Sequence, residues 1–164
     1  MSSRATELPR PYYNRGLIID SNLLLLFFVG LHDPTWIDRF KRTSKFSSED
    51  FARLVAFMDR FKEIVTTPSI LTEVSNLLGQ LPEKLKYSFR LHFARGLKNL
   101  NEQYTSSREL GDAPIFAKFG LTDTAILLAA RGKYVVLTDD FPLAQYLETQ
   151  KIDVINFNHL RKLD

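Results

Sequence analysis

Residues 16–30 have the sequence GLIIDSNLLLLFFVG. The first part, residues 16–20, is a short apolar run of β-branched character that ends in Asp20, which predicts a buried strand. Residues 23–30 are apolar throughout, which predicts a helix packed inside the protein. The stretch therefore predicts a buried strand and a buried helix with one acidic residue between them.

The same alternation of strand and helix continues along the chain. Strands are predicted at 63–66, 133–138 and 152–157, and helices at 47–62, 68–78, from Pro82, at 101–110, 123–131 and 141–149. Ser47 and Thr67 are the expected helix caps, and Pro68 suits a first helical position. Such alternation predicts an α/β fold, a three-layer α/β/α sandwich whose central sheet is mostly parallel, open and doubly wound. Ligands of such sheets bind outside the carboxyl ends of the strands.

The bulk composition is that of one ordinary globular domain. The chain has 164 residues, 45% of them hydrophobic and 25% charged, and it contains no cysteine. Disulfides, thiolate zinc sites and cysteine nucleophiles are therefore excluded. The longest apolar run, 23–29, is far shorter than the roughly twenty residues of a membrane span, so we expect a cytoplasmic protein. We expect a flexible tail at 1–15 and a single domain at 16–164, with a helical elaboration at about 80–119.

Acidic side chains fall where this topology places ligand sites. Asp20 closes the first strand, Asp139 and Asp140 follow the strand at 133–138, Glu73 lies in the helix after Pro68, and Asp123 begins a helix. Each could be a helix cap or a turn residue. However, Asp20 and Glu73 lie within apolar segments, where an unpaired buried charge is costly. Oxygen ligands without histidine or cysteine favour Mg²⁺ or Mn²⁺.

Four short motifs containing these acids resemble those of PIN-domain nucleases, in the same order along the chain. They are Ile18-Ile19-Asp20-Ser21-Asn22-Leu23-Leu24, Thr67-Pro68-Ser69-Ile70-Leu71-Thr72-Glu73-Val74, Gly120-Leu121-Thr122-Asp123-Thr124-Ala125-Ile126 and Val136-Leu137-Thr138-Asp139-Asp140. The spacing of the last two aspartates is also typical of that family. The resemblance covers residues 17 to about 157.

This resemblance implies a PIN-like fold and a metal-dependent endoribonuclease. Asp20, Asp123 and Asp140 would then bind Mg²⁺ or Mn²⁺, Glu73 would bind the metal or orient water, and Asp139 could replace Asp140. Ser21, Asn22 and Thr138 would position carboxylates or substrate phosphate. Resemblance to the toxin members of the family leaves open an inhibitory antitoxin partner, and the sequence leaves open a homodimer.

Two basic clusters contribute to a net charge of +3. The stretch 82–98 carries candidate RNA-binding residues, interleaved with the stacking candidates Tyr87 and His92, whereas Phe89 and Phe93 are expected in the core. The RNA-binding candidates are Lys84, Lys86, Arg90, Arg95 and Lys98. A second cluster consists of Arg39, Lys41, Arg42 and Lys45. A solvated helix face is the plain alternative for each.

Two other functions remain in competition. A catalytically silent PIN-like module that binds RNA or protein would have the same fold. A magnesium-dependent phosphatase is disfavoured, because the residue two positions after Asp20 is Asn22 rather than a second acid. No glycine-rich phosphate-binding motif occurs. The three histidines, His32, His92 and His159, are too far apart in sequence to suggest a triad or a metal motif.

Overall fold

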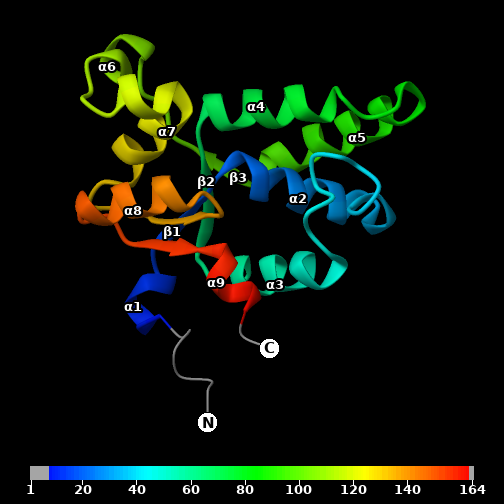
Figure 1. The fold of residues 1–164 in the computed structure, drawn as a ribbon, viewed down its shortest axis with the longest axis horizontal. Helices are drawn as coiled ribbons and strands as arrows, with labels where there is room; N and C mark the ends of the chain where they lie inside the picture. The colour runs from blue at the N-terminus through cyan, green and yellow to red at the C-terminus, as the bar shows by residue number, and fades with distance from the viewer. Residues whose placement is uncertain (1–7, 163–164) are drawn as a thin grey trace.

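The computed structural model describes residues 8–162, and a parallel sheet lies at its centre (Figure 1). Within these residues the sheet has five strands in the order β3-β2-β1-β4-β5, and each neighbouring pair is parallel. The strands are β1 (Gly16–Ile19), β2 (Glu63–Thr66), β3 (Leu100–Glu102), β4 (Val135–Thr138) and β5 (Val154–Asn156). The predicted α/β class is therefore confirmed.

Helices cover both faces of this sheet and make it the middle layer of a three-layer sandwich. The α-helices are α1 (Arg10–Tyr13), α2 (Ser21–His32), α3 (Ser48–Met58), α4 (Pro68–Leu78), α5 (Glu83–Gly96), α6 (Ser107–Gly111), α7 (Phe116–Ala130), α8 (Phe141–Thr149) and α9 (Phe157–Arg161). Two short 3₁₀ helices are η1 (Pro34–Trp36) and η2 (Leu97–Asn99). In the part of the chain that the structure describes, no helix is both long and apolar enough to span a membrane.

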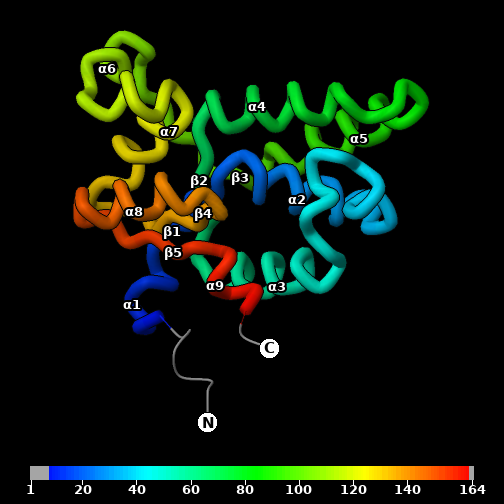
Figure 2. Tube along the Cα trace, in the orientation of Figure 1, coloured from blue at the N-terminus to red at the C-terminus, as the bar shows by residue number. Residues whose placement is uncertain are grey.

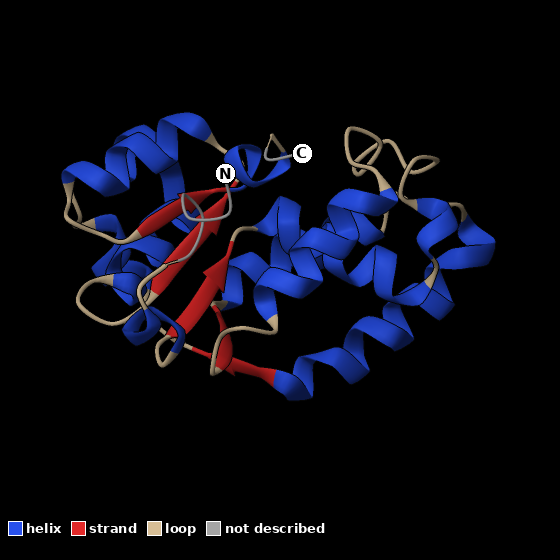
Figure 3. Ribbon diagram, turned by 90° about the horizontal axis from the view of Figure 1, so that it is seen from below, coloured by secondary structure: helices blue, strands red, loops and turns tan. Residues whose placement is uncertain are grey.

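The winding of the chain reverses between β1 and β4. From β1 the chain steps to β2 and then β3, and the connecting helices α2, α4 and α5 pack against one another on one face. The chain then crosses to β4 through α6 and α7 and continues outward to β5 through α8. These three helices lie on the other face (Figure 3). The adjacent strands β1 and β4 therefore flank the point where a crevice forms in open α/β sheets.

The buried core lies around these two central strands. Leu17, Ile18 and Ile19 of β1 are fully buried, and so are the three apolar residues of β4 at 135–137. The apolar residues of α2 at 23–26 are at most 1% exposed, which explains why this helix shows no polar face. The strand and helix predicted from residues 16–30 are both confirmed.

The predicted helix over 101–110 is confirmed only for residues 107–110. This segment contains β3, which pairs with β2 in the register Ile64↔Leu100, followed by α6, which begins after the cap Ser106. β3 is an edge strand of three residues and lacks the apolar alternation that identifies a half-buried strand. The expected helical elaboration at 80–119 therefore includes a strand of the main sheet.

Two further boundaries differ from the sequence prediction. Gly120, with φ 84° and ψ −172°, divides α7 into two helical pieces, so the helix expected after Thr122 corresponds to the second piece, and an unpredicted first piece begins at Phe116. This left-handed φ favours glycine because it has no Cβ. The last strand in the structure, β5, is shorter than the predicted strand at 152–157, because Asn156 already caps a terminal helix, α9.

The predicted tail is partly structured. Residues 1–7 lie outside the described part of the chain, but Arg10–Tyr13 form α1, which lies beside the β5 edge of the sheet (Figure 2). Arg15 forms an ion pair of 2.6 Å with Asp153, the residue before β5, and the Tyr12 hydroxyl donates to the same carboxylate. The second half of the segment expected as a flexible tail thus contains a short helix and contacts the residue before β5, while the part of that prediction covering residues 1–7 lies outside the described residues.

Candidate functional site

A pocket of about 360 Å³ lies at the carboxyl ends of β1 and β4, where the winding reverses. Four of the five acids singled out from the sequence line this carboxylate pocket, and these four come from four separate segments of the chain. The lining residues are Asp20, Ser21, Asn22, Glu73, Phe119, Gly120, Leu121, Thr122, Asp123, Ile126, Asp140 and Leu143. The structure thus brings together the predicted acidic residues at the predicted edge of the sheet.

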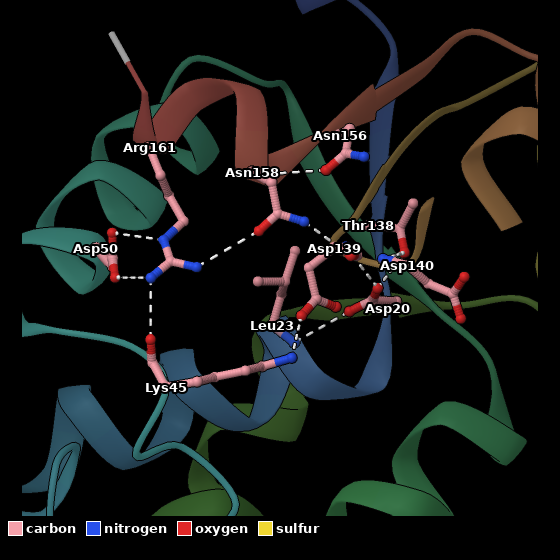
Figure 4. A network of polar contacts seen from close by, with 10 residues as sticks. All are labelled: Asp20, Leu23, Lys45, Asp50, Thr138, Asp139, Asp140, Asn156, Asn158 and Arg161. Atoms are coloured by element: carbon pink, nitrogen blue, oxygen red, sulfur yellow. Dashed lines mark hydrogen bonds and ion pairs between the residues drawn. The ribbon is translucent and has the colours of Figure 1, made fainter. Parts of the chain in front are cut away.

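Asp20 is the most tightly held of the four carboxylates. It is 7% exposed and caps α2, with Oδ1 accepting from the Leu23 N–H at 3.0 Å. Its other oxygen, Oδ2, accepts from the Thr138 hydroxyl and from the Asp139 N–H (Figure 4). Burial and the nearby Asp139 charge raise the pKa of Asp20 from 3.8 to about 7, although these hydrogen bonds oppose the rise. Its charged form is therefore disfavoured in this setting.

Asp123 and Glu73 face each other from α7 and α4. Burial, followed by the charges of Asp140 and Glu73, raises the pKa of Asp123 from 3.8 to about 6. Glu73 accepts a hydrogen bond of 2.5 Å from the Thr122 hydroxyl. Glu73 is exposed, so the expectation that it lies buried in an apolar helix is wrong, whereas the same expectation holds for Asp20.

The adjacent acids Asp139 and Asp140 have different surroundings. Asp140 lines the pocket and caps α8, with Oδ1 accepting from the Leu143 N–H at 2.9 Å. Asp139 does not line the pocket, and its side chain forms an ion pair of 2.5 Å with Lys45. Figure 4 shows the two side chains pointing apart. This geometry favours Asp140 over Asp139 as the member of the pocket.

The pocket suits a hard divalent cation in its donors and charge, and its four carboxylates share one lining without converging closely on a single point. Among residues 8–162, no three acidic or histidine side chains lie close enough to form a metal-binding group. Glu73 is held by Thr122, and Asp140 is held by the start of α8. The donor set is carboxylate oxygen, which Mg²⁺ and Mn²⁺ prefer, and mutual repulsion of the acids would be relieved by a cation.

The three predicted supporting residues have different positions. Thr138 donates to Asp20 and accepts from the Asp140 N–H, so it links the ends of β1 and β4. Asn22 is exposed at the pocket and can reach a ligand there. The Ser21 hydroxyl is buried and has no hydrogen-bond partner within the described residues. Of these three residues, only Thr138 has a side chain that contacts a carboxylate among the described residues.

The candidate RNA-binding residues lie on or just after α5, outside the carboxylate pocket. Tyr87 is 79% exposed, whereas Phe89 and Phe93 are buried, as expected. Lys86 is partly exposed and pairs with Glu83 at 2.7 Å. None of the five basic residues lines the pocket, and we call them the basic face of α5: Lys84, Lys86, Arg90, Arg95 and Lys98.

Two features of the site were not predicted from the sequence. Lys45 was noted only as part of a basic cluster, and its partner Asp139 is 94 positions away. The second feature is the pocket wall formed where Gly120 interrupts α7, because Phe119 and Leu121 lie on either side of it. Gly120 within an apolar run was the available signal for this break.

Two comparisons with known proteins found no relative of this chain. A scan against protein-family models matched none, and a search of curated proteins found no match.

Proposed function

We propose that the protein is a metal-dependent ribonuclease that cleaves RNA internally. The observation that carries this proposal is the meeting of four carboxylates from separate segments in one pocket at the carboxyl edge of β1 and β4. The charge of Asp123 is opposed there by Asp140 and Glu73, which is the electrostatic setting of a cation site. The resemblance of the four acidic motifs to PIN-domain nucleases supports the same conclusion.

Asp20, Asp123 and Asp140 would hold the cation, and Glu73 lines the same pocket. A divalent cation supplies Lewis acidity, which neutralises charge on a phosphodiester and makes water a stronger nucleophile. In the overall reaction, a water oxygen bonds to phosphorus and the bond from phosphorus to the leaving oxygen breaks. That leaving oxygen then takes up a proton.

The residues of the chain would contribute orientation and charge. Thr138 fixes the Asp20 carboxylate through its hydroxyl, and Thr122 fixes Glu73 in the same way. Glu73 is exposed at the pocket and is the lining acid not assigned to the cation, so it would accept a proton from water. Asn22 would donate to a substrate phosphate from the first turn of α2.

The alternative with a specific observation in its favour is a catalytically silent module that binds RNA or protein. It is favoured by the lack of any three clustered metal ligands among residues 8–162. Such a module would keep the fold and the pocket but would neither respond to Mn²⁺ nor cleave RNA.

One experiment distinguishes these functions. Purified protein is incubated with a circular RNA and with end-labelled linear RNAs of mixed sequence, in Mg²⁺, Mn²⁺ or chelator. We expect the circle to be opened with either metal and to stay intact in chelator. Asp140→Asn should remove this cleavage, while Asp112→Asn, which changes an exposed acid outside the pocket, should not. RNA binding without cleavage in every metal would support the silent module.

A further inference from the structure

The ion pair between Lys45 and Asp139 lies beside the carboxylate pocket and has no role in the function proposed above. Lys45 Nζ is 2.5 Å from Asp139 Oδ2 (Figure 4). The Asp139 side chain is only 4% exposed, whereas that of Lys45 is 55% exposed. The lysine therefore reaches from the connection between α2 and α3 to a nearly buried carboxylate at the end of β4.

The backbones of both partners are fixed by α9. Arg161 donates to the Lys45 carbonyl at 2.9 Å and to Asp50 Oδ1 at 3.1 Å, and Asp50 belongs to the capping box of α3. Asn158 donates to the Asp139 carbonyl at 2.9 Å. An ordinary surface ion pair must fix two free side chains and contributes little. Here the hydrogen bonds from Arg161 and Asn158 already fix the backbone positions of Lys45 and Asp139 (Figure 4).

The charge of Asp139 affects its neighbour in the pocket. The Asp139 N–H donates to Asp20 Oδ2, and the Asp139 carboxylate contributes to the raised pKa of Asp20. The other oxygen of Asp139, Oδ1, is buried without a hydrogen-bond partner within the described residues. Without Lys45, the Asp139 carboxylate would carry an unneutralised charge next to a site of like charge. It would then attract a cation itself.

Given the proposed function, on which this inference rests, we propose that Lys45 is a positioning residue of the carboxylate pocket. Its ammonium holds the Asp139 carboxylate outside the pocket and cancels its charge, so that Asp140 and not Asp139 is presented to a divalent cation. Lys45 does not touch the substrate. The pair decides which of two adjacent aspartates belongs to the metal centre.

A double-mutant cycle tests this role. The variants are Lys45→Met, Asp139→Asn and the double variant, with Lys45→Arg as the conservative change and Lys41→Met as a matched change of an exposed lysine in the same loop. Each is measured for Mn²⁺ affinity by calorimetry and for RNA cleavage at saturating Mn²⁺. Circular dichroism checks that each variant is folded.

We expect Lys45→Met to bind Mn²⁺ severalfold more tightly and yet to cleave about tenfold more slowly, because the released carboxylate draws the cation away from Asp140. The double variant should cleave within about threefold of Asp139→Asn alone, and Lys45→Arg and Lys41→Met should behave as wild type. A merely structural role would weaken both readouts together.

Other outcomes overturn the proposal. If the double variant cleaves as slowly as Lys45→Met, Lys45 acts on the substrate and not through Asp139. If Lys45→Met changes neither readout, the pair is an ordinary surface contact, while the nuclease function stands. If the wild-type protein neither binds Mn²⁺ nor cleaves RNA, the proposed function fails, and this inference fails with it.

Discussion

The carboxylate pocket and the basic face of α5 are both clusters of like charge, but the structure treats them differently. The pocket gathers acids from four separate segments, and burial, followed by the charges of Asp140 and Glu73, raises the pKa of Asp123. The basic face comes from one helix and the short turn that follows it, and Lys86 there already pairs with Glu83. The first cluster requires the whole fold, whereas the second requires a single helix.

This difference indicates which of the two charged clusters is the stronger evidence for a functional site. Two like charges about 4 Å apart repel by roughly 4 kcal/mol at an effective dielectric near 20. Acids that share one pocket at larger separations repel one another less strongly but in the same way, and a bound cation would relieve this repulsion. Basic residues along a solvated helix can turn away from one another at little cost, so their presence alone says less.

The largest effect is expected in the pocket. Asp20→Asn and Asp140→Asn should each reduce RNA cleavage at least about a hundredfold, because each removes a metal ligand. Both aspartates are helix caps, and asparagine caps as well as aspartate, so the variants should stay folded. The measurement is the single-turnover cleavage rate in Mn²⁺, with circular dichroism as the check on folding. Wild-type rates in both variants would locate the chemistry elsewhere.

A smaller effect is expected on the pH dependence of stability. Asp123 has a folded-state pKa of about 6 against 3.8 for the free group, so between these values the folded state binds more protons than the unfolded state. Its contribution to the free energy of unfolding is therefore complete below pH 3.8 and is lost as the pH rises through about 6.

Asp123→Asn should remove this loss. In chelator at pH 7 the variant should be more stable than wild type by about 1 kcal/mol, a value reduced for solvent screening, or by roughly 2–4 °C in melting temperature. Near pH 4 the two proteins should melt alike. The measurement is a series of thermal melts from pH 4 to pH 8. A variant that melts lower than wild type at pH 7 would show that Asp123 is a stabilising surface charge.

The smallest effect is expected on the basic face of α5. Lys84→Glu with Arg90→Glu, both at exposed positions, should weaken RNA binding for all sequences and flatten the salt dependence. Each lost phosphate contact should reduce the slope of log affinity against log salt by about 0.7 on single strands. The assay is fluorescence anisotropy with Asp140→Asn protein from 50 to 200 mM salt. An unchanged slope would leave this surface as a solvated helix face.

The sequence predicted the central part of the fold because its signals there are local. The apolar strand and helix of residues 16–30, the capping box at Ser47 and the Pro68 helix start all depend on neighbouring residues. β3 was missed because a three-residue edge strand carries no periodicity and is defined by its pairing with β2. The first piece of α7 could not be predicted from the cap at Thr122, because Gly120 separates that piece from the helix that Thr122 indicates.

The candidate site was predictable to the same extent. The placement of Asp20 and Asp140 follows from strand order, because the carboxyl ends of parallel strands meet at one edge, and Glu73 and Asp123 lie in helices that reach the same edge. The choice between Asp139 and Asp140 did not follow, because it depends on Lys45, which lies far away in the sequence. The exposure of Glu73 could not be predicted from the sequence either. A largely apolar helix still has a side that faces solvent, and the pattern does not show whether one given position lies on that side.

The most direct test of the central claim is the effect of Mn²⁺ on thermal stability. Wild type, Asp140→Asn and the control Asp112→Asn are melted in chelator, in MnCl₂ and in NaCl of equal ionic strength. At a hundred times its dissociation constant, a bound cation adds about 2.7 kcal/mol to the stability of the folded state. A shared cation site predicts a Mn²⁺-specific rise in melting temperature for wild type and Asp112→Asn, and a much smaller rise for Asp140→Asn. Equal shifts in all three proteins, or no shift beyond that of NaCl, would contradict it.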